Sequence, residues 1–205
     1  MAILSVEEES LLAAVGALRD GQVVGIPTDT VYGLAVDPFV PGAADAIFAA
    51  KLRPREVALP VLVASVEQAL SLATAVPPMA QALMDRFWPG PLTVVLPRRP
   101  DLAADLGDDD VTVGVRCPDH PVPLALCAKA GPLATTSANR HGEPTSETAA
   151  EVAAVFGAAV ALVLDGGRAS GLASTVVDYT GLEPRLLRQG RIPWADVLAA
   201  ARPQA

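Results

Sequence analysis

Residues 111–137, VTVGVRCPDHPVPLALCAKAGPLATTS, decide the fold class of this 205-residue chain. Residues 111–116 alternate between valine and another residue, which predicts a strand with one valine face and Thr112, Gly114 and Arg116 on the other. The segment from His120 to Lys129 predicts a helix entered through Pro121. Leu133–Ser137 predicts a second strand. A strand, a helix and another strand in such a short stretch indicate an α/β protein.

The same interleaving of helices and strands continues on both sides of this segment. We expect helices over residues 6–19 (capped by Ser5), 42–51, 66–72, 78–87, 148–156 and 194–201, and strands over 22–26, 60–64, 93–96 and 160–164. We expect residues 174–178 and 185–188 to be paired strands. Because the order is not a strict strand–helix–strand repeat, the sequence predicts a mixed β-sheet with flanking helices. We expect a single domain spanning residues 1–205.

Composition excludes several classes of protein. Hydrophobic residues make up 51% of the chain and charged residues 19%, which is ample material for a core. No apolar run approaches the ~20 residues that span a bilayer, so we expect no membrane anchor. The acidic start, residues 1–10, does not have the pattern of a signal peptide. Cys117 and Cys127 form no CxxC motif, and we expect two small buried thiols in a reducing cytoplasm.

The net charge is −8 and the isoelectric point is about 4.7. This charge has the wrong sign for a protein whose main task is to hold nucleic acid. A local basic cleft is still compatible with it, because the field in a site depends on the groups that line the site.

Three short polar stretches interrupt this apolar chain. They are PTDTVYGL at 27–34, KLRP at 51–54 and TTSAN at 135–139. Loops and strand ends on a rigid scaffold commonly carry binding and catalytic groups. The sequence has no Walker A, GxGxxG, GxSxG or HExxH motif. Two cations among hydroxyls and an amide therefore suggest a polyanion site of an unconventional kind.

Each stretch also has a purely structural interpretation. Thr28 and Thr30 share a face in an extended segment, with Asp29 pointing away, but such residues also suit a turn. Lys51 and Arg53 follow a predicted helix, where cations complement the helix dipole as well as they would suit phosphate. Ser137 and Asn139 share a face if the strand persists, and they also favour a capped loop.

Four other features leave similar alternatives. Arg116 is either a solvated charge on an edge strand or a bidentate clamp for a carboxylate. The run Asp108–Asp110 indicates a solvated loop rather than a magnesium site. Residues 165–167, Asp-Gly-Gly, predict a turn. We expect His120 to have a structural place near a helix start.

Eight motifs in order resemble the YrdC-like family over nearly the whole chain. Beside the three polar stretches, they are WPGPLT at 88–93, VxVRxPxHP at 113–121, DGG at 165–167, STVV at 174–177 and LRxG at 187–190. The family's best known members are threonylcarbamoyl-AMP synthases. The resemblance implies a twisted mixed α/β sheet with a concave, positively lined cavity. It also implies that L-threonine, bicarbonate and ATP react to give threonylcarbamoyl-adenylate and pyrophosphate, for a tRNA modification.

The resemblance also implies roles for individual residues. The family's polar tetrad at the nucleotide, with catalytic roles, matches Lys51, Arg53, Ser137 and Asn139. The threonine contacts match Thr30, Arg116 on the carboxylate, and Thr135 through its backbone. Further ATP contacts match Thr112, Thr145, Ser174 and Arg188. We expect no protein metal site, with Mg²⁺ carried by the nucleotide, and a separate tRNA threonylcarbamoyl transferase downstream.

Two departures and two rivals qualify this resemblance. Ala64 stands where some members have a histidine that contacts threonine, and residues 55–59 differ from the common pattern. Some members have a second C-terminal domain, which we do not expect here. One rival is a paralogue acting on another amine or carbamoyl substrate, such as the domain in hydrogenase maturation proteins. The other is a non-catalytic RNA-binding module, which the acidic charge disfavours; we expect weak tRNA binding at most.

Overall fold

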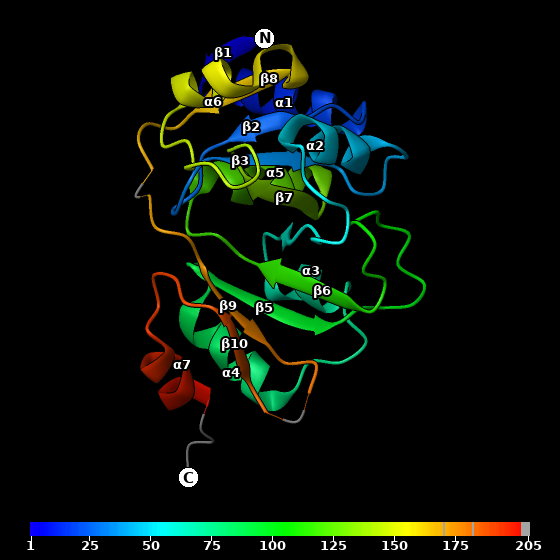
Figure 1. Cartoon of the computed structure of the whole chain (residues 1–205), viewed down its shortest axis with the longest axis vertical. Coiled ribbons are helices and arrows are strands. Elements are labelled where there is room, and N and C mark those ends of the chain that lie inside the picture. Colours follow the sequence, from blue (N-terminus) through cyan, green and yellow to red (C-terminus); the bar gives the residue numbers. More distant parts are fainter. Residues whose placement is uncertain (170, 182, 202–205) are drawn as a thin grey trace.

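A ten-stranded mixed sheet runs the length of the molecule in the computed structural model (Figure 1), which describes residues 1–169, 171–181 and 183–201. The strand order is β1-β8-β2-β3-β7-β4-β6-β5-β9-β10. The strands are β1 (Ala2–Ser5), β2 (Val24–Ile26), β3 (Gly33–Val36), β4 (Val61–Leu62), β5 (Leu92–Pro97), β6 (Thr112–Arg116), β7 (Leu133–Ser137), β8 (Leu162–Asp165), β9 (Thr175–Asp178) and β10 (Arg185–Arg188). The predicted α/β class with a mixed sheet is confirmed.

Helices cover both faces of the sheet. They are α1 (Glu8–Arg19), α2 (Ala43–Lys51), α3 (Val66–Leu70), α4 (Pro78–Phe87), α5 (Pro121–Ala130), α6 (Ala149–Phe156) and α7 (Trp194–Ala201). Helices α1 and α5 pack on each other, and α4 packs on α7 and β5. Alternate residues of β3 show the two layers, because Ala35 joins the core under α1 and α5 while Leu34 and Val36 join the larger core on the other face.

Three neighbouring strands place apolar side chains in the core and direct the alternate residues, several of them polar, toward a cavity. In β6, Val113 and Val115 are buried in the core. Thr112, Gly114 and Arg116 alternate with them and line a cavity. Thr93 of β5 and Val176 of β9 line the same cavity. The alternation seen in the sequence therefore builds one wall of a site.

Several local expectations were wrong. Ser5 does not cap α1: it ends β1, and its hydroxyl donates to the Glu7 carboxylate, while Glu7 stands at the N-cap position. Val111 lies outside β6 and is 74% exposed. The expected strand over residues 60–64 is only two residues long, Val61–Leu62. Strands β1 and β3 were not expected, and β3 begins inside the polar stretch at 27–34.

The expectations for His120, for the two cysteines and for the last two strands were confirmed. His120 is the N-cap of α5, where its Nδ1 accepts a hydrogen bond from the Val122 N–H (3.2 Å). Cys117 and Cys127 are free and buried. Strands β9 and β10 pair antiparallel. No helix in the described ranges has the length and apolarity needed to cross a bilayer.

Candidate active site

The predicted polar residues meet at a cavity of about 500 Å³ on the sheet face formed by β3, β7, β4, β6, β5 and β9. Nine of the eleven residues expected at the site line it: Thr30, Arg53, Thr112, Arg116, Thr135, Ser137, Thr145, Ser174 and Arg188. Lys51 and Asn139 do not line it. They lie directly behind the wall, where both contact Ser137.

Arginines and hydroxyls dominate the lining. Three arginines, seven threonines and two serines are present. Among the described lining residues there is no carboxylate, imidazole or thiol. Burial lowers the pKa of Arg53 and of Arg188, yet a guanidinium keeps its charge near neutral pH. The lining therefore suits an anionic ligand held by charge and hydrogen bonds rather than covalent catalysis by a nucleophile.

Lys51 is buried and organises the loop that follows β7. It is the last residue of α2 and is 1% exposed, so it is not a solvated cation at a helix end. Its Nζ donates to the Ser137 carbonyl (2.6 Å), to the Asn139 carbonyl, and to Asn139 Oδ1 (3.1 Å). A lysine ammonium has three N–H donors, and these acceptors use all three. Lys51 therefore holds the loop in place and acts on a ligand only through its charge.

Asn139 and Ser137 complete this buried loop. The Ser137 hydroxyl donates to Asn139 Oδ1 (2.5 Å), and Asn139 Nδ2 donates to the carbonyls of Arg140 (2.8 Å) and Glu143 (2.7 Å). The structure thus supports the interpretation of a capped loop and also places Ser137 on the cavity wall.

Arg53 and Arg188 also line the cavity, and each is held by a different segment of the chain. Arg53 Nε donates to the Val57 carbonyl (2.8 Å) and its Nη2 to the Ala58 carbonyl (3.1 Å). Arg188 donates from Nε and Nη2 to the Ser174 carbonyl (3.1 and 3.0 Å). Both guanidinium groups are therefore held by backbone carbonyls, and each keeps further N–H groups for a ligand.

Arg116 lies at the end of β6 with three of its five donors engaged. Nε donates to the Gly90 carbonyl (3.0 Å), Nη1 to Thr30 Oγ1 (2.9 Å), and Nη2 to Asp29 Oδ1 (2.5 Å). It is 7% exposed in a central strand, so the interpretation as a solvated charge on an edge strand was wrong. The expectation that Asp29 points away was also wrong, because Asp29 and Arg116 form a buried ion pair.

The turn at residues 28–31 fixes Thr30. The Thr28 hydroxyl donates to the Val31 carbonyl (2.6 Å), and its oxygen accepts from the backbone N–H groups of Thr30 and Val31 (both 3.2 Å). Thr28 Oγ1 lies 3.0 Å from Thr30 Oγ1, and both residues line the cavity. The interpretation of this stretch as a turn is confirmed, and the turn places both threonines on the cavity wall.

Thr93 is a cavity residue that sequence reasoning missed. Its Oγ1 lies 2.9 Å from Ser174 Oγ, which also accepts from Arg188 Nη2 (3.0 Å). The alternation of Thr93 and Val95 with core residues of β5 was the signal that could have found it. Ala64, the departure from the family pattern, is not among the residues that line the cavity.

The acidic loop at 108–110 contacts residues at the edge of the cavity. Asp109 accepts from the Thr112 hydroxyl, and Asp108 pairs with Arg55 (3.2 Å), so this loop supports the cavity edge. No group of three or more His, Cys, Asp or Glu residues that could hold a metal occurs within the described ranges.

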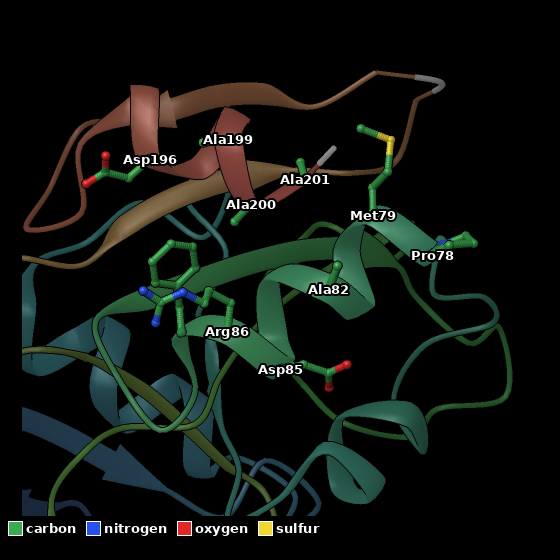
Figure 2. A pocket seen from close by; sticks show the side chains of 10 residues that line it. Pro78, Met79, Ala82, Asp85, Arg86, Asp196, Ala199, Ala200 and Ala201 are labelled. Atoms are coloured by element: carbon green, nitrogen blue, oxygen red, sulfur yellow. The ribbon is translucent and has the colours of Figure 1, made fainter. Parts of the chain in front are cut away.

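A larger hollow of about 740 Å³ lies between α4 and α7 (Figure 2), lined mostly by alanine and other apolar side chains.

Comparisons with known proteins agree with this geometry. The Sua5/YciO/YrdC family model, described as telomere recombination, matches residues 16–190. A protein of Mycobacterium tuberculosis (strain H37Rv) is 42% identical over 183 residues, which are 89% of this chain and 84% of that one. The threonylcarbamoyl-AMP synthase of Pyrococcus abyssi is 39% identical over 194 residues, covering 94% of this chain and 57% of that protein.

A solved structure gives the same result. Pyrococcus abyssi Sua5, crystallised as a complex with L-threonine, superposes with a TM-score of 0.90 at 37% identity. The match covers 98% of this chain and 61% of that one. A family model that covers most of the chain, together with relatives near 40% identity, shows that this chain belongs to the Sua5/YciO/YrdC family.

Proposed function

We propose that this protein is a threonylcarbamoyl-AMP synthase, which forms threonylcarbamoyl-adenylate and pyrophosphate from L-threonine, bicarbonate and ATP. One observation supports this most: a single cavity carries three arginines and nine hydroxyl side chains, and no described lining residue offers a nucleophilic thiol or a general base. Such a lining suits a reaction that proceeds by positioning and charge stabilisation. The synthase of Pyrococcus abyssi is a relative with this activity in its name.

The chemistry divides into two steps. The neutral threonine amine attacks the carbon of bicarbonate, which then loses water, or the carbon of the CO₂ derived from it, in which case the nitrogen loses a proton. Either route gives the same N-carboxylate. An oxygen of this N-carboxylate then attacks the α-phosphorus of ATP, and the bond to pyrophosphate breaks. Negative charge accumulates on the phosphate oxygens in the second step, and in-line geometry is required.

The residues of the cavity have distinct roles in this reaction. Arg53 and Arg188 neutralise the phosphates, with the hydroxyls of Thr112, Ser137 and Ser174 as donors to phosphate oxygens. Thr145, which also lines the cavity, is assigned to the part that binds ATP. Thr30 and Arg116 hold threonine, whose carboxylate accepts from the remaining N–H groups of Arg116, and Thr135 contacts it through its backbone.

The roles of Lys51 and Asn139 follow from their place behind the wall. They keep Ser137 in position, and the Lys51 charge adds to the positive field at the phosphates. Mg²⁺ is expected to be carried by the triphosphate, because the described lining has hydroxyls and no carboxylate cage. The bound ion would neutralise phosphate charge. We place the protein in the cytoplasm, upstream of a tRNA threonylcarbamoyl transferase that takes the adenylate.

An assay of pyrophosphate release with single omissions tests the proposal. Release is expected only when ATP, threonine and bicarbonate are all present. Arg116→Ala is expected to raise KM for threonine more than KM for ATP, and Arg188→Ala is expected to do the reverse. Equal turnover with glycine, or without bicarbonate, would contradict the proposed reaction and favour a paralogue acting on another substrate.

A further inference from the structure

The three arginines of the cavity differ in their counterions. Within the described ranges, no carboxylate lies within ion-pair distance of Arg53 or Arg188. Arg116, in contrast, pairs with Asp29 at 2.5 Å, and the two side chains are only 8% and 9% exposed. The cavity thus has a part with net positive charge, at Arg53 and Arg188, and a part around Arg116 whose charge is balanced.

A ligand carboxylate on Arg116 would lie close to Asp29. Three of the five N–H donors of Arg116 are used by Gly90, Thr30 and Asp29, so two remain, one on each terminal nitrogen. The Nη2 atom whose second N–H would hold the ligand already donates to Asp29. Asp29 therefore repels a simple anion at this position. It attracts the ammonium group of an amino acid, because the α-amino and carboxylate groups of that ligand are neighbours.

We propose that Asp29 is a specificity-determining residue of the amino-acid subsite. Together with Arg116 it forms a buried dipole that accepts a zwitterion, with Asp29 on the side of the ammonium group, and that excludes phosphate and simple carboxylates. The phosphates of the nucleotide then go to Arg53 and Arg188, which have no acidic partner. This inference rests on the proposed function, because it assumes that Arg116 receives the carboxylate of an amino acid.

The position of Asp29 supports this role. No described residue that lines the main cavity has a carboxylate or imidazole, and Asp29 is in direct contact with a lining arginine. Asp29 also lines a second pocket, together with His120 and Gly166. Asp29 itself does not line the main cavity, so it acts on a ligand there through its charge and through its contact with Arg116.

Calorimetric titrations without ATP test this inference. The wild type, Asp29→Asn and Asp178→Asn are each titrated with threonine and with 3-hydroxybutanoate, which lacks the amine. We expect the preference of the wild type for threonine to fall by about ten-fold or more in Asp29→Asn, since the negative charge that balances Arg116 is lost. We also expect inorganic phosphate to compete with threonine in this variant and not in the wild type.

Asp178→Asn is the matched control. Asp178 is an equally buried carboxylate that pairs with Arg185 (2.8 Å) and does not line the cavity. This variant is expected to keep the wild-type preference. An unchanged preference in Asp29→Asn, with threonine still bound, would overturn the inference. Threonine binding by the wild type without adenylate formation would count against the proposed reaction and not against the role of Asp29.

A second measurement needs only the wild type. If Asp29→Asn does not fold, 1-aminopropan-2-ol, which keeps the amine and lacks the carboxylate, is compared with 3-hydroxybutanoate. A balanced subsite predicts that the amine binds at least as well as the carboxylate. A preference of ten-fold or more for the carboxylate would show a net positive subsite and overturn the inference.

Discussion

Lys51 is the residue whose environment differs most from what its sequence position suggests. Cations near a helix C-terminus are commonly solvated and complement the dipole. Lys51 instead turns into the protein, and its ammonium group donates to three oxygen acceptors from two residues, none of them a carboxylate. Burial, together with the charge of Arg53, lowers the pKa of Lys51 to about 8. An anionic ligand in the cavity would stabilise the charged form.

We predict that ATP binding is coupled to proton uptake above pH 8. The free protein loses the Lys51 proton as the pH rises through about 8, and the nucleotide charge restores it. Calorimetry at pH 8.5 in two buffers with different ionisation enthalpies is expected to show proton uptake, with weaker ATP affinity than at pH 7. Lys51→Met should show no such uptake. Equal proton uptake by both proteins would assign the titrating group elsewhere.

The same shift has a consequence for stability. The ordinary pKa of lysine, 10.5, applies to the unfolded chain, and the folded value is about 8. Between these values the unfolded chain binds more protons, so the stability contributed by this group rises with pH over that window and is lost as the pH falls through 8. Chemical denaturation between pH 8 and 10 is expected to show the wild type gaining stability relative to Lys51→Met.

Leu52 is strained, and we predict that Leu52→Gly stabilises the protein. Leu52 follows α2 with φ 54° in the left-handed region, and it is 72% exposed. The left-handed conformation costs a non-glycine residue about 1–2 kcal/mol. Glycine costs about 0.5–1 kcal/mol in chain entropy. The free energy of unfolding should therefore increase by about 0.5–1 kcal/mol. For a protein of this size, each kcal/mol raises Tm by roughly 2–4 °C. A lower Tm by calorimetry would contradict this prediction.

At the level of elements, Arg55 joins three segments beside the cavity. It pairs with Asp45 of α2 (2.5 Å) and with Asp105 (2.7 Å) and Asp108 (3.2 Å) of the acidic loop. Its guanidinium also lies over the Phe48 ring, 4.9 Å from the centroid. The segment from Arg53 to Leu59 lines the cavity in part, and its carbonyls hold Arg53. Arg55 therefore helps to fix the geometry of Arg53, which lines the cavity, and does not itself line the cavity.

We predict that Arg55→Gln raises KM for ATP several-fold and leaves KM for threonine nearly unchanged. Partly exposed ion pairs contribute about 0–1 kcal/mol each, so three pairs and a cation–π contact together support this size of effect. Steady-state kinetics measures both constants. Arg99→Gln is the control. Within the described residues, the one ion-pair partner of Arg99 is the exposed Asp101. Equal increases in both constants would show a general loosening of the fold.

Long or alternating elements could be predicted from the sequence, and short buried ones could not. The helix over 78–87 and the strand over 133–137 have the predicted bounds, since each has a clear period and a clear stop. Strand β3, Gly33–Val36, is buried on both faces, so it shows no alternation, and the preceding turn residues concealed it. Strand β1 starts the chain and lacks a flanking turn signal.

The site could be predicted as a set of residues but not as a set of contacts. Motif order identified nine residues that line the cavity. The burial of Lys51 depends on where β7 ends relative to α2, and the Asp29–Arg116 pair joins residues 87 positions apart. Contacts of that kind are set by tertiary packing, which local propensity and periodicity do not encode.

At the scale of the whole molecule, a net charge of −8 surrounds a cavity whose ionisable lining residues are arginines. The acidic exterior repels a polyanion at long range, while the cavity attracts a small one locally. The cavity arginines are occupied by ATP and threonine under the proposed function. The molecule therefore suits a small nucleotide better than a nucleic acid backbone.

We predict weak tRNA binding with a shallow salt dependence. The salt slope of log K grows by about 0.7–0.9 for each phosphate that a protein neutralises, and few cations remain for this purpose. Fluorescence anisotropy with labelled tRNA at near-physiological salt measures both affinity and slope. Submicromolar binding with a steep slope would contradict the prediction and favour an RNA-binding module.

The most direct test of the central claim is the mass of the product. The protein is incubated with ATP, L-threonine and ¹³C-bicarbonate, and the nucleotides are separated and weighed by mass spectrometry. The proposed reaction predicts threonylcarbamoyl-adenylate that is one mass unit heavier than the product from unlabelled bicarbonate, with an equal amount of pyrophosphate. Pyrophosphate or AMP without a labelled adenylate would contradict the claim that this cavity joins threonine, bicarbonate and ATP.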